Sequence, residues 1–206
     1  SKLEEATVKR YLPAAELSKL KSTTASNPQC EYARKLFLFS YYCYGISFID
    51  MAMLTAAHIK QMEDGDYIVY KRQKIKRQKG VKPISIKITP AIRQLIGSLQ
   101  AASPTVDDFL LPIVTRSGYT GERLYMHIRA RYSKYQKYLR LLAEELGIDF
   151  HLTSYVSRHT AAMTLQRNNI PREVISQMLG HADLETTNIY LDSFDNKVIN
   201  EAAKVL

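Results

Sequence analysis

Four side chains near the carboxyl end of the sequence have the types and spacing to act on a phosphate group: Arg158, His159, His181 and Tyr190. An arginine carries a permanent charge and a planar fork of donors that matches two phosphate oxygens. His181 follows Gly180 at a turn, where its imidazole can reach a further oxygen. The phenol of Tyr190 titrates near about pH 10, and nearby positive charge favours its nucleophilic phenolate. Together these residue types indicate a phosphate clamp with its own nucleophile.

The segment 153–190 that holds these residues is predicted to form three short helices. Breakers at 168–171 and at Gly180 divide the segment, and the last helix is expected to begin near Asp183. The apolar residues recur at helical spacing and are Ala161, Met163, Leu165, Val174, Ile175, Met178 and Leu179. The candidate chemical groups therefore lie at or between helix ends.

Composition limits the class of partner. The chain has 206 residues, 46% of them hydrophobic, which is enough for one large or two small domains with a core. A formal charge of +9 favours a polyanionic partner, although a generically basic protein would share it. Cys30 and Cys43 form neither a metal-ligand spacing nor a disulfide framework, so we expect a reducing, cytoplasmic environment. No apolar run is long enough to cross a bilayer, and no histidines and acids combine into a convincing metal site.

The densest positive patch is the run KRQKIKRQKGVK at 71–82. The β-rich segments 66–70 and 84–88 flank this run and are predicted to pair as a hairpin. Lys71, Arg72, Lys76 and Arg77 are therefore candidates for contacting the phosphates of a nucleic acid. A solvated charge run that only aids solubility is the alternative interpretation.

Other helices are predicted at about 14–21, 31–44, 47–54, 89–99, 124–146 and 194–206. Segment 109–114 is expected to be a buried strand or turn, and 115–122 a loop. Basic residues and tyrosines alternate along 124–146, where they could follow a DNA backbone, although most of the tyrosines suit a core or boundary position. The amphipathic 194–206 helix could fold back on its own core or dock on a neighbouring subunit.

Two motifs resemble the C-terminal boxes of the tyrosine recombinases, the phage-integrase family: SRHTAAMTL at 157–165 and LGHADLETTNIY at 179–190. His181 precedes Tyr190 by nine positions, which is the family's spacing. The resemblance implies an α+β, mainly helical domain with a small antiparallel β-sheet, similar to the integrase catalytic fold. We expect 1–206 to form one such catalytic domain, a fragment without the N-terminal DNA-binding domains of full-length relatives. A chance combination of unrelated core and surface residues is the alternative.

The resemblance also implies an activity. A site-specific recombinase of this family cleaves and rejoins DNA through a 3′-phosphotyrosyl intermediate, here for integration or excision of a mobile element. Tyr190 would be the nucleophile, Arg158 and His181 would bind the phosphate, and Lys74 or else Lys76 would protonate the departing 5′ oxygen. The implied partners are double-stranded DNA and a homotetramer assembled on it. No cofactor is expected, because the covalent link conserves the bond energy.

The sequence departs from the family in its first catalytic box. That box contains a Gly-x-Arg triplet, whereas this chain has Gly45, Ile46 and Ser47, and serine cannot supply charge to a phosphate. The stretch GISFIDMA at 45–52 resembles integrases of Bacteroides-type mobile elements, so the missing arginine need not mean an inactive enzyme. By the same resemblance Asp50 would lie behind the site; the alternative is an ordinary exposed helix aspartate.

A second departure lies in the His-x-x-Arg box that ends at Arg158. Tyr155 replaces its histidine and is expected either to hydrogen-bond the phosphate or to pack. His159 is typical of the family, and we assign it to the DNA-binding residues with a structural hydrogen-bonding role rather than proton transfer. These two departures leave a DNA-binding protein with a decayed site as an alternative function. A type IB topoisomerase, which shares the chemistry, is a further alternative.

Overall fold

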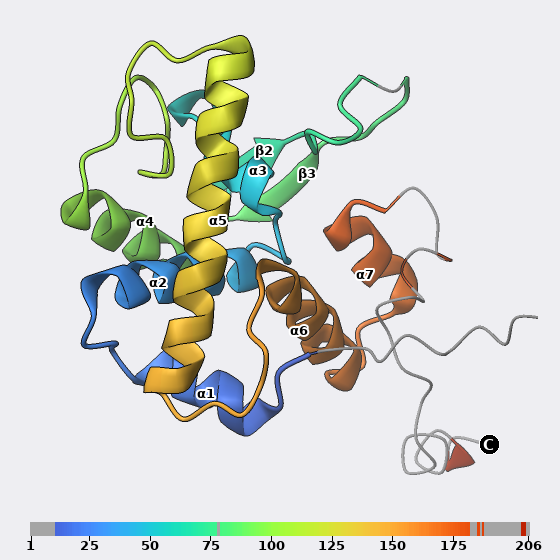
Figure 1. Ribbon diagram of the computed structural model, residues 1–206. Helices are drawn as coiled ribbons and strands as arrows, with labels where there is room; N and C mark the ends of the chain where they lie inside the picture. The colour runs from blue at the N-terminus through green and yellow to red at the C-terminus, as the bar shows by residue number, and fades with distance from the viewer. Residues whose placement is uncertain (1–10, 78, 182–184, 186, 188–202, 205–206) are drawn as a thin grey trace, which may run out of the picture.

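The computed structural model describes residues 11–77, 79–181, 185, 187 and 203–204, and these residues form a mainly helical domain with one small sheet (Figure 1). The helices are α1 (Ala14–Ser22), α2 (Pro28–Tyr42), α3 (Phe48–Ala52), α4 (Pro90–Ala102), α5 (Gly121–Glu145), α6 (Ser154–Arg167) and α7 (Arg172–Leu179). A short 3-10 helix, η1 (Ala56–His58), precedes the sheet. The predicted α+β, mainly helical fold class is confirmed.

Helix α2 is the centre of the domain. Helices α4, α5 and α6 all pack against it, and its Phe37 and Phe39 have no exposed surface. The helix begins three residues before the predicted start, because the side chain of Asn27 caps it by accepting hydrogen bonds from the backbone N–H groups of Gln29 and Cys30. An apolar helix that is buried on several sides thus gives the other elements a common surface on which to pack.

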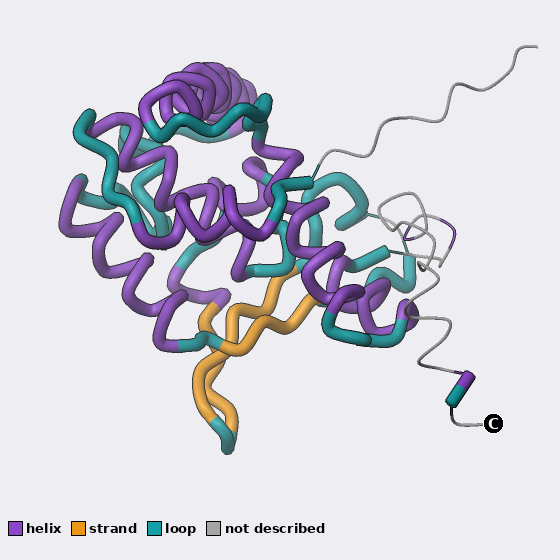
Figure 2. The backbone as a smooth tube through the Cα atoms, turned by 90° about the horizontal axis from the view of Figure 1, so that it is seen from below, coloured by secondary structure: helices purple, strands orange, loops and turns teal. Residues whose placement is uncertain are grey.

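The sheet is antiparallel with strand order β1 (Ile59–Met62), β2 (Gly65–Tyr70) and β3 (Ile84–Lys87). The predicted pairing of 66–70 with 84–88 is confirmed, with Tyr70 opposite Ile84. Strand β1 was not predicted, because its residues are mostly exposed and show no apolar alternation. The strands form a ribbon that extends from one side of the helical body (Figure 2). The basic segment 71–83 therefore connects the central strand to an edge strand.

Helix α5 is the longest element and packs on α2 and α3. It begins at Gly121, before the predicted start at 124; the segment 115–122 looked like a loop, but Glu122 suits the first turn of a helix. Ile128, Tyr135 and Leu139 lie on its buried face. Segment 109–114 is a mostly buried turn region with one isolated bridge from Phe109. The opposite face of α5 stays available to solvent.

Helices α6 and α7 match the first two of the three helices predicted for 153–190. The third, expected near Asp183, and most of the predicted 194–206 helix lie outside the described residues, as does Tyr190. Cys30 and Cys43 are buried free thiols. None of the helices in the described part of the chain combines the length and hydropathy needed to span a membrane.

Candidate active site

Arg158 is a buried cation that backbone carbonyl groups hold in place. Its side chain lies on α6, and the residue is only 6% exposed. Nη1 donates a hydrogen bond to the Gly45 carbonyl at 3.1 Å, and Nη2 donates to the Leu179 carbonyl at 2.5 Å. Because a buried charge needs polar partners, these carbonyls fix the guanidinium between the turn after α2 and the end of α7.

The turn after α2 approaches Arg158 closely because it contains a glycine. Tyr44 and Gly45 both have left-handed backbone conformations, with φ of 59° and 72°. A Cβ atom on Gly45 would lie 2.4 Å from the Cα of Arg158, so a side chain at this position has no room. Behind the turn, the hydroxyl groups of Ser40 and Ser157 are 2.7 Å apart and join α2 to α6. The position of Arg158 thus depends on contacts between distant segments.

His181 lies directly beside Arg158. Its Nε2 atom is 2.7 Å from Nη2 of Arg158, and a guanidinium can only donate, so Nε2 is the acceptor. The other ring nitrogen, Nδ1, lies 2.8 Å from the buried Thr187 hydroxyl and carries the ring proton in this arrangement. Gly180, at φ 63°, caps α7 in the left-handed conformation and directs the chain to His181. The structure thus brings together two of the predicted phosphate-binding residues.

Ser47 was predicted to be the first residue of a helix at 47–54, but it instead caps the N-terminus of α3 from just outside the helix. Its hydroxyl accepts from the backbone N–H of Asp50 at 3.2 Å and donates to Oδ2 of Asp50 at 2.6 Å. The second carboxylate oxygen, Oδ1, accepts from the backbone N–H of Gln73 at 2.7 Å. Asp50 is 4% exposed, so its interpretation as an ordinary exposed aspartate is wrong. The carboxylate holds the segment after β2 against α3.

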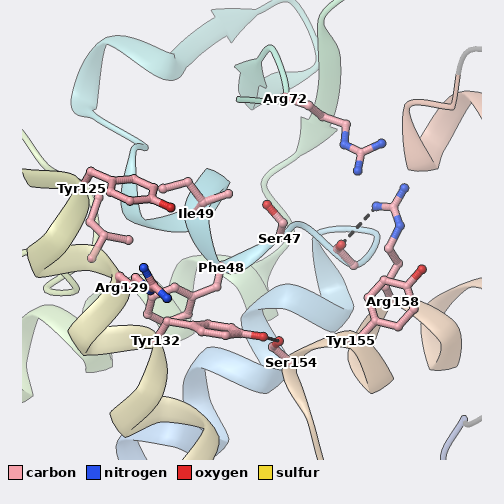
Figure 3. A pocket seen from close by; sticks show the side chains of 12 residues that line it. Ser47, Phe48, Ile49, Arg72, Tyr125, Arg129, Tyr132, Ser154, Tyr155 and Arg158 are labelled. Carbon is pink, nitrogen blue, oxygen red and sulfur yellow. Dashed lines mark hydrogen bonds between the residues drawn. The ribbon is translucent and has the colours of Figure 1, made fainter. Parts of the chain in front are cut away.

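Arg72 reaches the site from that same segment. Its Nη1 atom donates to the Gly180 carbonyl at 3.4 Å. Figure 3 shows its guanidinium pointing toward that of Arg158, with Ser47 between the two elements that carry them. The accepting carbonyls, of Leu179 and Gly180, lie at the negative C-terminal end of α7, which favours nearby cations. Arg72 therefore supplies a second cation beside the position where the first-box arginine is missing.

A pocket of about 620 Å³ opens over these residues (Figure 3). Its lining consists of Gly45, Ser47, Phe48, Ile49, Arg72, Tyr125, Ile128, Arg129, Tyr132, Ser154, Tyr155 and Arg158, none of them acidic. Arg72 and Arg158 form one end beside Tyr155, and mostly aromatic and aliphatic side chains from α3 and α5 form the other, where Arg129 also lies. The pocket thus combines an anion-binding end with an apolar end.

The other predicted site residues occupy different positions. Tyr155, in the first turn of α6, lines the pocket, and its ring contacts that of His159 edge-on with centroids 4.8 Å apart. His159 is buried and does not line the pocket. Lys71, Lys74, Lys76 and Arg77 are exposed on 71–83, a loop that projects near α7 (Figure 1), and none of them lines the pocket. Their DNA contacts, and the roles of Tyr155 and His159, stay predictions.

The sequence suggested that basic residues and tyrosines of 124–146 could follow a DNA backbone, but it did not place any residue of this helix in the site. Tyr125, Arg129 and Tyr132 share one helix face at spacings of four and three residues. This spacing was visible, but it does not say which face of the helix meets the pocket. Ser154 was also missed; its hydroxyl lies 3.1 Å from the Tyr132 hydroxyl. In the described part of the chain, no group of histidine, cysteine and acidic residues is placed to hold a metal ion.

The chain belongs to the phage integrase family, whose model matches residues 10–197. The tyrosine recombinase XerD of Halalkalibacterium halodurans is 43% identical over 54 residues, or 26% of this chain and 18% of that protein. XerC of Rhodospirillum centenum is 31% identical over 114 residues, or 55% of this chain and 31% of that protein. The matched segments thus span less than a third of these two relatives.

Solved structures share the fold at lower identity. The XerA recombinase has a TM-score of 0.63 at 22% identity, with 94% of this chain and 64% of that chain covered. The XerH site-specific recombinase bound to its difH substrate has a TM-score of 0.65 at 20% identity, covering 94% and 53%. The Tn1549 transposon integrase, in complex with a circular intermediate DNA, has a TM-score of 0.66 at 13% identity, covering 99% and 68%. These likenesses establish an integrase-like fold.

Proposed function

We propose that this chain is the catalytic domain of a tyrosine site-specific recombinase that cleaves and rejoins double-stranded DNA through a 3′-phosphotyrosyl intermediate. The observation that supports the proposal is the convergence of Arg72, Arg158 and His181 on the end of α7. Two guanidiniums that line one pocket, that of Arg158 being buried and held by backbone carbonyls, are suited to bind a phosphodiester and to neutralise the charge that develops as it reacts. Family membership supplies the reaction class.

Arg72 takes the role that the family assigns to the first-box arginine. Ser47 cannot bind a phosphate with a positive charge, but its hydroxyl holds Asp50, and Asp50 holds the backbone next to Arg72. Arg72 reaches the pocket that Ser47 lines. The segment after β2 therefore supplies the positive charge that the first box lacks. The missing arginine therefore does not leave the phosphate with a single cation.

The chemistry requires a nucleophile and an acid. Tyr190 attacks the phosphorus as its phenolate, which nearby positive charge favours, the bond from phosphorus to the 5′ oxygen breaks, and the 3′ side of the strand stays linked to the phenolic oxygen. Lys74, two positions after Arg72 on the exposed turn, gives a proton to the departing 5′ oxygen. Attack by the 5′ hydroxyl of a partner strand reverses these bond changes. The phosphotyrosyl bond keeps the energy of the broken phosphodiester bond, so rejoining needs no nucleotide cofactor.

The biological role we propose is integration or excision of a mobile element by a homotetramer assembled on DNA. The stretch at 45–52 supports a relationship to Bacteroides-type elements, and the fold similarity to a transposon integrase is consistent with such a role. The second candidate is a DNA-binding protein with a decayed site. Ser47 and Tyr155, which replace an arginine and a histidine of the family boxes, are the observations that favour it.

The deciding experiment uses a nicked suicide substrate that carries the verified recombination site and loses a short fragment after cleavage. The full-length protein and its Tyr190→Phe variant are incubated with this DNA and separated on a denaturing gel. A protein–DNA band that Tyr190→Phe lacks, with equal DNA binding by both proteins, is the expected result. Binding without any band would favour the decayed site, and cleavage of unrelated DNA sequences with equal efficiency would favour a topoisomerase.

A further inference from the structure

Exposed aromatic side chains gather in the pocket, two of them at its apolar end and Tyr155 beside Arg158. Among the residues that the structure describes, six large hydrophobic side chains are exposed, and three of them, Tyr125, Tyr132 and Tyr155, line this one pocket. Tyr125 is 58% exposed and Tyr132 is 37% exposed. Exposed apolar surface that gathers at one site indicates a ligand or partner.

Packing and hydrogen-bond contacts hold the aromatic side chains at the apolar end of the pocket in defined orientations. Phe48 of α3 stacks on the buried Tyr135, with ring centroids 5.1 Å apart and planes inclined by 22°. The ring of Tyr132 meets Phe48 edge-on at 5.3 Å, and its hydroxyl lies near that of Ser154. Contacts on two sides thus fix the orientation of Tyr132. The neighbouring Tyr125 projects over the same end of the pocket (Figure 3).

Charge narrows the choice of ligand. Arg72, Arg129 and Arg158 line the pocket together with these aromatic side chains, and no acidic residue does. An anion at Arg72 and Arg158 and a flat group against Tyr125 and Tyr132, with Arg129 beside it, would satisfy both ends at once. A nucleotide is such a molecule, because its phosphate and its base are joined through one sugar. Bases stack well on aromatic side chains whatever their identity.

We propose that the apolar end of the pocket binds one nucleobase of the strand whose phosphate lies on Arg72 and Arg158, with the base against Tyr125 and Tyr132. The inference rests on the proposed function for the placement of that phosphate. A volume of about 620 Å³ accommodates a nucleoside monophosphate. In a duplex the base must leave its stack to reach this surface, so the pocket favours sites where the helix opens easily next to the scissile phosphate.

The test uses a short single-stranded oligonucleotide with one 5-iododeoxyuridine, a photoreactive base that crosslinks to aromatic side chains stacked on it. After ultraviolet irradiation of the complex, the crosslinked peptide is sequenced. The expected crosslink lies on Tyr125 or Tyr132. An abasic site at the same position should weaken binding roughly tenfold, since the stacking contact is lost.

Variants at Tyr125 separate stacking from charge. Tyr125→Ala should remove most of the affinity difference between the intact and the abasic oligonucleotide, and Tyr125→Phe should keep it. Met126→Ala is the matched control, because Met126 is 52% exposed on the same helix and does not line the pocket. Crosslinks elsewhere in the protein, failure to bind the oligonucleotide, or an equal affinity for the abasic strand would overturn the proposal.

The result is independent of the suicide-substrate experiment. Crosslinks at Tyr125 or Tyr132 without a covalent adduct would support the base site and reject the recombinase activity. A covalent adduct with crosslinks outside the pocket would keep the recombinase and reject the base site.

Discussion

Arg72 and Arg158 donate hydrogen bonds to the carbonyl groups of two consecutive residues, Gly180 and Leu179, at the end of α7. Two guanidiniums from distant parts of the chain therefore meet at one helix terminus. The negative end of the helix dipole offsets part of their mutual repulsion. This shared anchor explains how the anion-binding end of the pocket keeps two cations although Ser47 occupies the usual arginine position.

We expect Arg72→Ala to slow formation of the covalent DNA adduct by roughly 10²-fold, because one preorganised donor contributes about 3 kcal/mol to a charged transition state. The rate is measured in single turnover on the suicide substrate. Lys60→Ala, which removes an exposed charge on β1 away from the pocket, is the control and should leave the rate unchanged.

The double variant Ser47→Arg with Arg72→Ala should recover part of the lost rate, since position 47 lines the same pocket. The same single-turnover assay measures the recovery. An unchanged rate in Arg72→Ala alone would show that another group supplies the charge.

Asp50→Ala should destabilise the fold by about 1–3 kcal/mol, because the backbone N–H of Gln73 and the hydroxyl of Ser47 lose their buried acceptor. The rate of covalent adduct formation should fall by a larger factor than the affinity for DNA, because the segment that carries Arg72 loses its contact with Asp50. Asp50→Asn should lower the stability and the rate less than Asp50→Ala does, because its amide keeps an oxygen that accepts from the backbone N–H of Gln73 and an NH₂ group that can donate to Ser47. Chemical denaturation and the single-turnover rate measure the two effects; equal behaviour of both variants would contradict the proposed clamp.

Three glycines with positive φ should differ in their response to alanine. Gly45→Ala should cost about 3 kcal/mol or more, because its Cβ would collide with the backbone of Arg158 in addition to the conformational strain. At Gly180 the nearest atom is the end of the Ile84 side chain, which can move, so the cost should be smaller. Gly118→Ala has open space and should cost only the strain, about 1–2 kcal/mol. Urea unfolding of the three variants tests this order.

His127 should make stability depend on pH. Burial lowers the pKa of its imidazole, and Arg131, Arg116 and Lys134 lower it further. The neutral ring accepts a hydrogen bond from the backbone N–H of Thr115 at 3.1 Å. The unfolded chain binds a proton near about pH 6.5 and the folded chain does so only at lower pH, so stability is full above that value and falls as pH decreases. His127→Gln should flatten this part of the curve, which denaturation at a series of pH values measures.

Much of the fold could be read from local sequence. Apolar residues at helical spacing predicted α6 and α7, and the helix predicted at 89–99 corresponds to α4, which Thr89 caps. Strand β1 was not predicted, because the residues of this exposed edge strand do not alternate between apolar and polar. The early start of α2 followed from the side chain of Asn27, a start signal that was present in the sequence and was not used.

The sequence by itself determined which side chains are suited to bind a phosphate. The motifs around Arg158 and His181 predicted one phosphate site, and the structure brings these two side chains together. Only the tertiary structure decided that Arg72, rather than any other cation of 71–82, lies in the pocket. That choice depends on Asp50 accepting the Gln73 N–H and on Gly180 accepting Arg72. Such contacts join residues far apart along the chain, and their geometry is set by the packing of α3, α7 and the sheet, which local periodicity does not encode.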